Sequence, residues 1–224
     1  MTLRIAVLVS GRGSNLQALL DAIADTTLDA RIVGVFSDRP DAVALQRIAP
    51  PLRWSEAAKS FPDRLSFDHA LAEAVAACDP DWVVCAGYMR ILGDGFIERF
   101  RGRLLNIHPS LLPKYRGLRT HARALEAGDA VHGTSVHFVV PELDAGAVIA
   151  QADMPVLPGD DPQMLAQRLL PLEHRLLVAV LRLAAAGRLT ERDGMACCDG
   201  QPLFTPLRLD SSVDLTLPDA TTSP

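Results

Sequence analysis

The sequence predicts an α/β protein, a single domain with a doubly wound and mostly parallel sheet. Three observations carry this prediction. Short apolar runs alternate with segments of helical periodicity. Residues 3–9 and 81–87 are nearly continuous apolar runs, which is typical of strands buried on both faces of a parallel sheet. A turn of small residues, Ser10 to Asn15, follows the first run and opens a segment with apolar residues at helical spacing.

The same patterns place the remaining elements in order along the chain. Strands are expected at residues 3–9, 31–36, 81–87, 103–108, 134–140 and 148–151, and helices after Asn15 and at residues 65–77, 120–127 and 163–186. The segment at 134–140 alternates polar and apolar residues, so we expect it to have one wet face and to pair with 148–151 as a hairpin. We expect the domain to end near residue 205, because the pattern weakens beyond Arg188. Residues 206–224 then form an extension, and residues 218–224 a disordered tail.

Composition limits the classes of function. The chain has 224 residues, 49% of them hydrophobic and 22% charged, which is the balance of a globular protein. A net charge of −5 argues against nucleic acid as a partner, although a single small anion can still bind where positive groups converge. No apolar stretch reaches the roughly 20 residues of a membrane helix, and the amino terminus lacks the pattern of a signal peptide. We therefore expect a cytoplasmic protein that does not bind membranes.

The cysteines and the potential metal ligands predict neither a disulfide nor a metal site. Cys78, Cys85, Cys197 and Cys198 form no CxxC pair, and adjacent cysteines seldom bridge. Reduced thiols are the prediction for this compartment. Since no ligand spacing is visible either, we expect no metal.

The glycine loop at residues 10–15 has two interpretations. Gly11, Gly13, Ser14 and Asn15 would let backbone N–H groups approach an anion at a helix N-terminus. The alternative is a tight turn in which Ser14 or Asn15 caps the helix. The loop matches neither the dinucleotide fingerprint nor the Walker lysine loop, so we expect a small anion rather than a dinucleotide.

Asn106 and His108 are the candidate catalytic pair. They lie two residues apart on a predicted strand, so both side chains leave the same face at its carboxyl end. An amide and an imidazole there can donate to one carbonyl oxygen. The alternative is that His108 bonds the loop that follows. Asp144 lies in a turn, where it either performs ordinary turn chemistry or faces His108 and assists proton transfer.

Five segments together resemble the phosphoribosylglycinamide formyltransferases, a folate-dependent family of purine biosynthesis. The segments are residues 10–16, 87–92, 105–115, 132–137 and 142–146, and the resemblance covers about the first 185 residues. It implies a Rossmann-like formyltransferase fold. It also implies that 10-formyltetrahydrofolate, as cosubstrate, gives its formyl group to the amine of glycinamide ribonucleotide by direct attack, without metal. The expected partners are small molecules, and the expected state is a monomer or weak homodimer.

The resemblance also implies residue roles. Asn106 and His108 would stabilise the oxyanion, and Asp144 would keep His108 protonated and help to move a proton. The ribonucleotide would contact Gly13, Ser14, Asn15 and Glu173. The folate would contact Arg64, Met89, Arg90, Ile91, Leu92, Asn106, Val140, Pro141, Glu142, Leu143 and Asp144.

Several of these residues have ordinary alternatives. Met89, Ile91 and Leu92 are core or helix-start residues if no pterin packs there, and Arg64 and Glu173 are then exposed helix residues. We expect structural roles for His121 and His137, with His121 the better candidate for a substrate contact. The chain also departs from the resemblance at Leu170-Pro171-Leu172, where Pro171 can kink the helix, at Ala145, and at Arg116 and Arg119. Ala145 fits its turn if its φ is negative.

Three other functions compete. A methionyl-tRNA formyltransferase needs an RNA-binding domain, and the residues after Arg188 are few and not basic. A formyltetrahydrofolate hydrolase carries a regulatory domain before its core, whereas the first strand here begins at Leu3. A binding module that performs no chemistry has no need of Asn106, His108 and Asp144.

Overall fold

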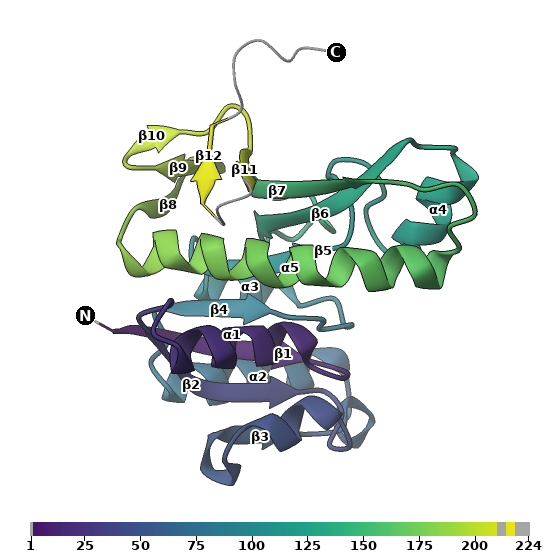
Figure 1. Ribbon diagram of the computed structural model, residues 1–224. Helices are drawn as coiled ribbons and strands as arrows, with labels where there is room; N and C mark the ends of the chain where they lie inside the picture. The colour runs from purple at the N-terminus through teal and green to yellow at the C-terminus, as the bar shows by residue number, and fades with distance from the viewer. Residues whose placement is uncertain (1, 210–213, 218–224) are drawn as a thin grey trace. The chain divides into compact units, whose positions relative to one another are not determined.

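The structure confirms the α/β class and the mostly parallel sheet with helices. It is a computed structural model that describes residues 2–209 and 214–217 (Figure 1). The chain divides into two compact units, residues 1–106 with 139–141 and residues 107–138 with 142–224. The single domain and its end at residue 205 stay predictions.

The first unit contains a parallel sheet in the order β5-β4-β1-β2-β3. Its strands are β1 (Leu3–Val9), β2 (Ala30–Ser37), β3 (Arg53–Ser55), β4 (Trp82–Cys85) and the first residues of β5 (Leu104–His108). The continuous apolar runs are buried as predicted, since Ile5 to Val9 and Val83 to Val84 have no exposed surface. The carboxyl ends of parallel strands meet at one edge of the sheet, which is where ligands bind in such folds.

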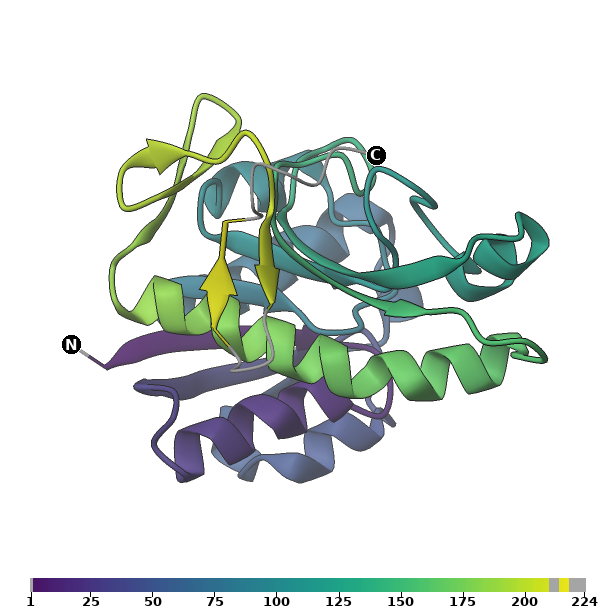
Figure 2. The same ribbon diagram turned by 45° about the horizontal axis from the view of Figure 1, so that its top comes forward.

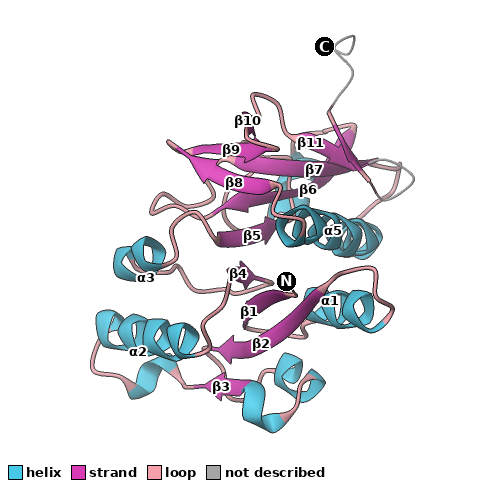
Figure 3. Ribbon diagram, turned by 90° about the vertical axis from the view of Figure 1, so that its left-hand side faces the viewer, coloured by secondary structure: helices cyan, strands magenta, loops and turns pink. Residues whose placement is uncertain are grey.

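Helices cover both faces of this sheet, which confirms the doubly wound arrangement. Figure 3 shows α1 (Ser14–Ala24) on one face and α2 (Arg64–Ala77) and α3 (Asp94–Arg99) on the other. Three short 3-10 helices complete the unit, at Val43–Arg47, Pro50–Leu52 and Ala58–Ser60. Phe67 and Leu71 of α2 pack with Phe96 and Phe100 in one buried cluster. The Asp63 carboxylate caps α2 by accepting from the Ser66 N–H at 2.7 Å.

The second unit is built on an antiparallel hairpin. It consists of β6 (Val131–Phe138) and β7 (Val148–Pro155), and α5 (Pro162–Ala185) contacts both strands (Figure 1). The predicted hairpin is therefore confirmed, with β6 starting three residues earlier than expected. Asp161 caps α5, Pro162 occupies its first turn, and the helix continues through Pro171. The shorter α4 (Thr120–Glu126) precedes the hairpin and also contacts α5.

The chain after Arg188 holds more structure than its pattern predicts. β8 (Leu189–Arg192), β9 (Met195–Cys198) and β10 (Gln201–Pro202) form an antiparallel meander beyond the C-terminal end of α5 (Figure 2). β11 (Leu207–Leu209) then pairs parallel with β7, and β12 (Leu215–Thr216) pairs antiparallel with β11. Strands of two to four residues are too short to show a period, which is why the sequence did not predict them.

The four cysteines are free thiols, as expected. None of the helices in the described parts of the chain is long and apolar enough to cross a membrane. The predicted disordered tail, residues 218–224, lies outside the described residues.

Candidate active site

Strand β5 carries the candidate catalytic pair. Asn106 is half-buried and pairs in register with Cys85 of β4, and His108 is the last residue of the strand with 6% of its surface exposed. The His108 carbonyl accepts hydrogen bonds from the Ser110 N–H at 2.9 Å and the Thr134 hydroxyl at 3.0 Å. These bonds fix the point at which the strand ends. The predicted position of the pair, at the carboxyl end of a buried strand, is confirmed.

Both ring nitrogens of His108 face acceptors. Nδ1 lies 3.4 Å from Oδ2 of Asp144, and Nε2 lies 3.0 Å from the carbonyl oxygen of Tyr115. A carbonyl only accepts, so Nε2 carries a proton in this contact. The imidazolium form satisfies both partners, whereas the neutral ring leaves one nitrogen facing an acceptor without a proton.

The protonation of His108 is nevertheless set mainly by burial. Burial lowers the pKa of His108 below its usual value, while the Tyr115 carbonyl and the Asp144 carboxylate raise it without fully offsetting burial. A negative charge that develops beside the ring would therefore strengthen the imidazolium form. The alternative in which His108 bonds the following loop describes its Nε2 contact correctly.

Asp144 is a buried and ionised carboxylate. Burial by itself raises its pKa, but the His137 ring, the Gly117 N–H and His108 together lower the pKa below the usual value. The Gly117 N–H donates to Oδ2 at 2.8 Å. Asp144 has a φ of 48°, which is strained for a residue other than glycine, and it holds this conformation in the turn at 142–146. Ala145 keeps a negative φ, as its fit to the turn required.

His137, for which the sequence analysis expects a structural role, contacts the Asp144 carboxylate. Its Nε2 lies 3.6 Å from Oδ1 of Asp144, so the carboxylate stands between two imidazole rings, and its Nδ1 donates to the Phe138 carbonyl at 2.7 Å. The pairing of β6 with β7 shifts between Val136 and His137, where Ile149 is the extra residue on β7. Such a bulge redirects a side chain. The polar alternation of Ser135 and His137 was the available signal.

Residues 115–117 form a segment that contacts both His108 and Asp144. Its contacts are the Tyr115 carbonyl on His108, the Gly117 N–H on Asp144, and an ion pair of 2.7 Å between Arg116 and Glu142. The Tyr115 hydroxyl donates to Asp129 at 2.8 Å, which ties the segment to the loop after α4. The segment therefore holds one acceptor against each side of the His108 ring, either directly or through Asp144.

The two arginines that depart from the resemblance are paired with acids. Arg116 pairs with Glu142, and Arg119 lies 3.3 Å from Glu126. Both pairs are exposed, so each contributes little to stability. The positive charge that Arg116 and Arg119 add to this surface is thus largely balanced within the second unit.

The glycine loop leads into α1 in the first unit. Gly13 is the N-cap residue with a φ of 73°, and a Cβ at this position would lie 2.5 Å from Cβ of Ala44. Only glycine fits both conditions. The N-cap position is held by Gly13 and not by Ser14 or Asn15, which are the first two residues of the helix. The glycine loop joins the carboxyl end of β1 to the first turn of α1.

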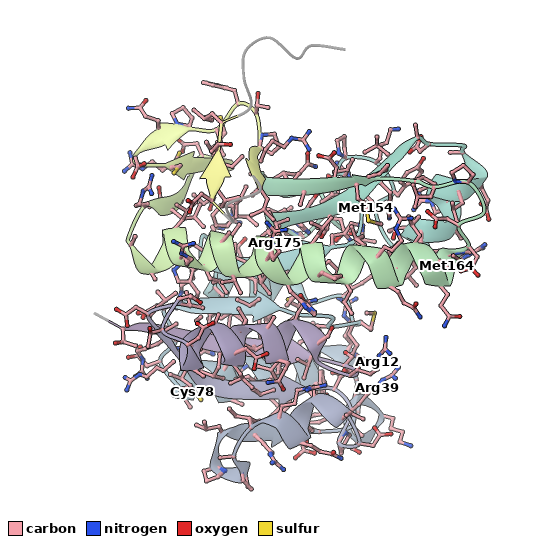
Figure 4. All side chains as sticks on the ribbon, in the orientation of Figure 1. Arg12, Arg39, Cys78, Met154, Met164 and Arg175 are labelled. Carbon is pink, nitrogen blue, oxygen red and sulfur yellow. The ribbon has the colours of Figure 1, made fainter. Side chains whose placement is uncertain are left out.

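Two exposed arginines stand near the glycine loop. Arg12 lies within it, and Arg39 follows β2 by two residues (Figure 4). The Arg12 carbonyl accepts from Arg47 Nε at 3.0 Å, and Arg12 is exposed. Both side chains add positive charge at the carboxyl ends of β1 and β2, the end of the sheet where an anion is expected.

Ser10 connects the glycine loop to residues 89–92, which we call the predicted folate loop. Its hydroxyl donates to Oδ1 of Asp38 at 2.6 Å and accepts from the Met89 N–H at 2.9 Å. The Ser10 N–H donates to the Gly87 carbonyl at 3.1 Å. One buried serine therefore joins the ends of β1, β2 and β4.

The loop at residues 89–92 exposes large apolar side chains. Met89 is 63% exposed and Ile91 55%, so the alternative that places them in the core is wrong, while Leu92 is buried as that alternative expects. Arg64 is not simply solvated either, because its Nη2 donates to the Ile91 carbonyl at 2.9 Å. Exposed apolar residues with an arginine beside them suit a partly apolar, anionic ligand.

Comparison with known proteins shows which family the chain belongs to. The sequence profile of the formyl transferase family matches residues 3–181. The chain belongs to the formyl transferase family.

The relatives agree with this assignment. Phosphoribosylglycinamide formyltransferase of Escherichia coli is 46% identical over 203 residues, which span 90% of this chain and 96% of the relative. The solved structure of phosphoribosylglycinamide formyltransferase from Coxiella burnetii, in complex with CHES, has a TM-score of 0.85 and 44% identity, covering 91% of this chain and 96% of its own. A formyltetrahydrofolate deformylase from Pseudomonas syringae pv. tomato has a TM-score of 0.80 and 25% identity, covering 88% of this chain and 66% of its own.

The remaining predicted contacts of this formyltransferase lie in both units. Val140 and Pro141 belong to the first, where the Val139 N–H bonds the Leu104 carbonyl at 2.9 Å. Glu142 and Leu143 precede Asp144 in the second unit, and both are exposed. Glu173 is half-buried on α5. Their substrate contacts stay predictions.

Proposed function

We propose that this formyltransferase moves the formyl group of 10-formyltetrahydrofolate to the amine of glycinamide ribonucleotide, a step of purine biosynthesis. Two kinds of observation support the proposal. The E. coli and C. burnetii relatives cover nearly their whole length and carry the name of this activity. The single structural observation that carries it is the contact between His108 Nδ1 and Asp144 Oδ2 at 3.4 Å, at the end of β5.

The chemistry needs two bonds to change and one proton to move. The amine nitrogen attacks the formyl carbon, and the carbonyl π electrons move to oxygen. Asn106 donates an amide N–H and His108 a ring N–H to this oxyanion. The attacking nitrogen then loses a proton, folate N10 gains one, and the bond from the formyl carbon to N10 breaks. Asp144 assists this transfer and stabilises the imidazolium.

His108 must exchange a partner to take this role. In the structure its Nε2–H donates to the Tyr115 carbonyl and its Nδ1 faces Asp144. The formyl oxygen replaces the Tyr115 carbonyl as the acceptor in our proposal, and the contact with Asp144 is kept. Because the oxyanion carries more negative charge than a carbonyl, the exchange raises the pKa of His108.

The two substrates use different parts of the chain in this proposal. The ribonucleotide phosphate takes the N–H groups of Gly13, Ser14 and Asn15, and Glu173 binds its amine-bearing end. The folate takes Arg64, residues 89–92, Asn106 and residues 140–144. The exposed Met89 and Ile91 offer apolar surface to the pterin.

The proposed setting follows from the pathway. We place the enzyme in the cytoplasm, with small molecules as its partners, as a monomer or weak homodimer. The proposed reaction uses no metal.

A spectrophotometric assay of the 10-formylfolate donor tests the proposal. We expect turnover that requires glycinamide ribonucleotide. Donor consumption without it would indicate the deformylase activity named for the P. syringae relative. The absence of turnover in both conditions would leave a binding module.

A further inference from the structure

One face of α2 holds the predicted folate loop. Arg64, Phe67 and Asp68 share this face, because residues three and four apart in a helix are neighbours. Phe67 lies under Arg90, whose Cζ is 5.0 Å from the ring centroid, and Arg64 donates to the Ile91 carbonyl. Three residues of one helix turn therefore meet successive parts of residues 90–93.

Asp68 is the third of these contacts. It packs against Gly93, where a Cβ would lie 2.7 Å from Oδ2 of Asp68. Glycine at position 93 is thus what allows the carboxylate to approach the loop. Arg64 Nε lies 3.4 Å from the same oxygen, within ion-pair distance but long for a hydrogen bond.

The burial of the Asp68 carboxylate costs free energy of folding. The residue is 5% exposed, and neither carboxylate oxygen makes a well-formed hydrogen bond to a described residue. The buried Nε of Arg90 likewise makes no well-formed hydrogen bond to a described residue. Burying an incompletely bonded charge costs free energy. Burial accordingly raises the pKa of Asp68, although Arg64, Arg90 and the Gly93 N–H lower it.

The ion pair of Asp68 with Arg64 is weak evidence that this carboxylate stabilises the fold. Replacing a buried ion pair by well-packed apolar residues of similar volume is often neutral or stabilising. Asparagine has the shape of aspartate and carries no charge. An explanation must therefore come from what the charge does to the two arginines beside it.

We propose that Asp68 is a positioning residue that orients Arg64 and Arg90 at the folate loop, so that their guanidinium groups receive the anionic glutamate end of the folate. This rests on the proposed function. Asp68 holds Arg64 through Nε, which leaves the outer guanidinium nitrogens for the loop and the ligand. Arg90 is held by the Phe67 ring on one side and the field of Asp68 on the other. Asp68 itself stays buried and does not contact the ligand.

Binding of folic acid and of pteroic acid, which lacks the glutamate, to Asp68→Asn tests the proposal. We expect the Kd of folic acid to rise about tenfold and the Kd of pteroic acid to change by less than about twofold. We also expect the variant to fold, because asparagine keeps the volume of aspartate and the half-exposed Arg64 can be solvated without its partner. In the formyl-transfer assay, KM for the donor should rise while kcat and KM for the ribonucleotide stay within about twofold.

Glu73→Gln is the matched control. Glu73 is an acid on the same helix, but it is exposed and pairs with Arg99 away from the loop. We expect this variant to bind both ligands as the parent does. An equal loss of folic and pteroic acid binding by Asp68→Asn, or no loss of either, would overturn the positioning role. If the parent protein binds folic acid without transferring a formyl group, the proposed function fails while the binding comparison still decides the role of Asp68.

Discussion

The ring nitrogens of His108 connect the structure to the proposed chemistry. One faces the ionised Asp144 and the other the Tyr115 carbonyl, so the ring lies between two acceptors. An imidazole held in this way needs little reorganisation when a third acceptor, the developing oxyanion, replaces the carbonyl. Preorganised donors of this kind are worth several kcal/mol in water-excluded sites.

Removal of the His108 ring or of the Asp144 charge should slow the reaction without unfolding the protein. His108→Ala loses one oxyanion donor, and Asp144→Asn loses the charge that stabilises the imidazolium. We expect each variant to cut kcat by about 10² or more. His69→Ala, on the exposed side of α2, is the control and should retain its activity. Near-normal turnover by either variant would contradict the role of that residue.

A second pair of histidines predicts the response of stability to pH. Burial and the neighbouring His121 lower the pKa of His132 to about 4, and Nδ1 of His121 lies 3.0 Å from Nε2 of His132. The unfolded chain therefore binds a proton at His132 below pH ~6.5 that the folded protein does not bind until pH ~4. The contribution of neutral His132 is fully present above pH ~6.5 and is lost as pH falls toward 4.

Urea unfolding at pH 7 and pH 4.5 measures this effect. The parent protein should lose roughly 2–3 kcal/mol more than His132→Gln over this interval. Glutamine keeps a polar partner for His121 and cannot take up the proton. Equal losses in the two proteins would show that His132 does not titrate as its burial implies.

At the scale of elements, the start of α1 depends on one glycine. Gly13 combines a positive φ with close contact to Ala44, and neither condition admits a side chain. Gly13→Ala should lower the free energy of unfolding by at least ~1 kcal/mol and raise KM for the ribonucleotide. Gly11→Ala is the control, because a Cβ there meets nothing within 4 Å. If both variants behave alike in unfolding and kinetics, the loop geometry at Gly13 is not what binding requires.

Strand β11 pairs with β7, and we expect this pairing to stabilise the second unit. Leu207 is 4% exposed and pairs with Ala150, whereas Leu217 is 66% exposed. Leu207→Ala should therefore cost roughly 2–3 kcal/mol by chemical denaturation. Leu217→Ala should cost less than ~0.5 kcal/mol. A small loss at Leu207 would mean that this short strand adds little to the fold.

At the scale of the whole molecule, the sequence predicts what periodicity encodes. The runs at residues 3–9 and 81–87 are apolar because their strands are buried on both faces, and the structure places strands there. The same reasoning found the end of β5 and the helix after the glycine loop. The strands after Arg188 escaped it because pairing with neighbours, rather than a local pattern, makes them strands.

The site shows the same limit at finer detail. Asn106 and His108 are close in sequence, so strand alternation brings them to one face. The contact of His137 with Asp144 depends on a shift of register between β6 and β7, and the Tyr115 carbonyl on a positive φ of 58°. Neither the register shift nor the positive φ can be predicted from the residue types. The roles of Asn106, His108 and Asp144 came from family resemblance together with chemistry, and they stay predictions until variants are measured.

The fate of the formyl carbon tests the central claim most directly. Donor labelled with ¹³C at the formyl group is incubated with enzyme and glycinamide ribonucleotide, and ¹³C NMR follows the label. We predict that the label appears as the formamide of the ribonucleotide, and only when the ribonucleotide is present. Label released as formate, or label that remains on the folate, would contradict the account.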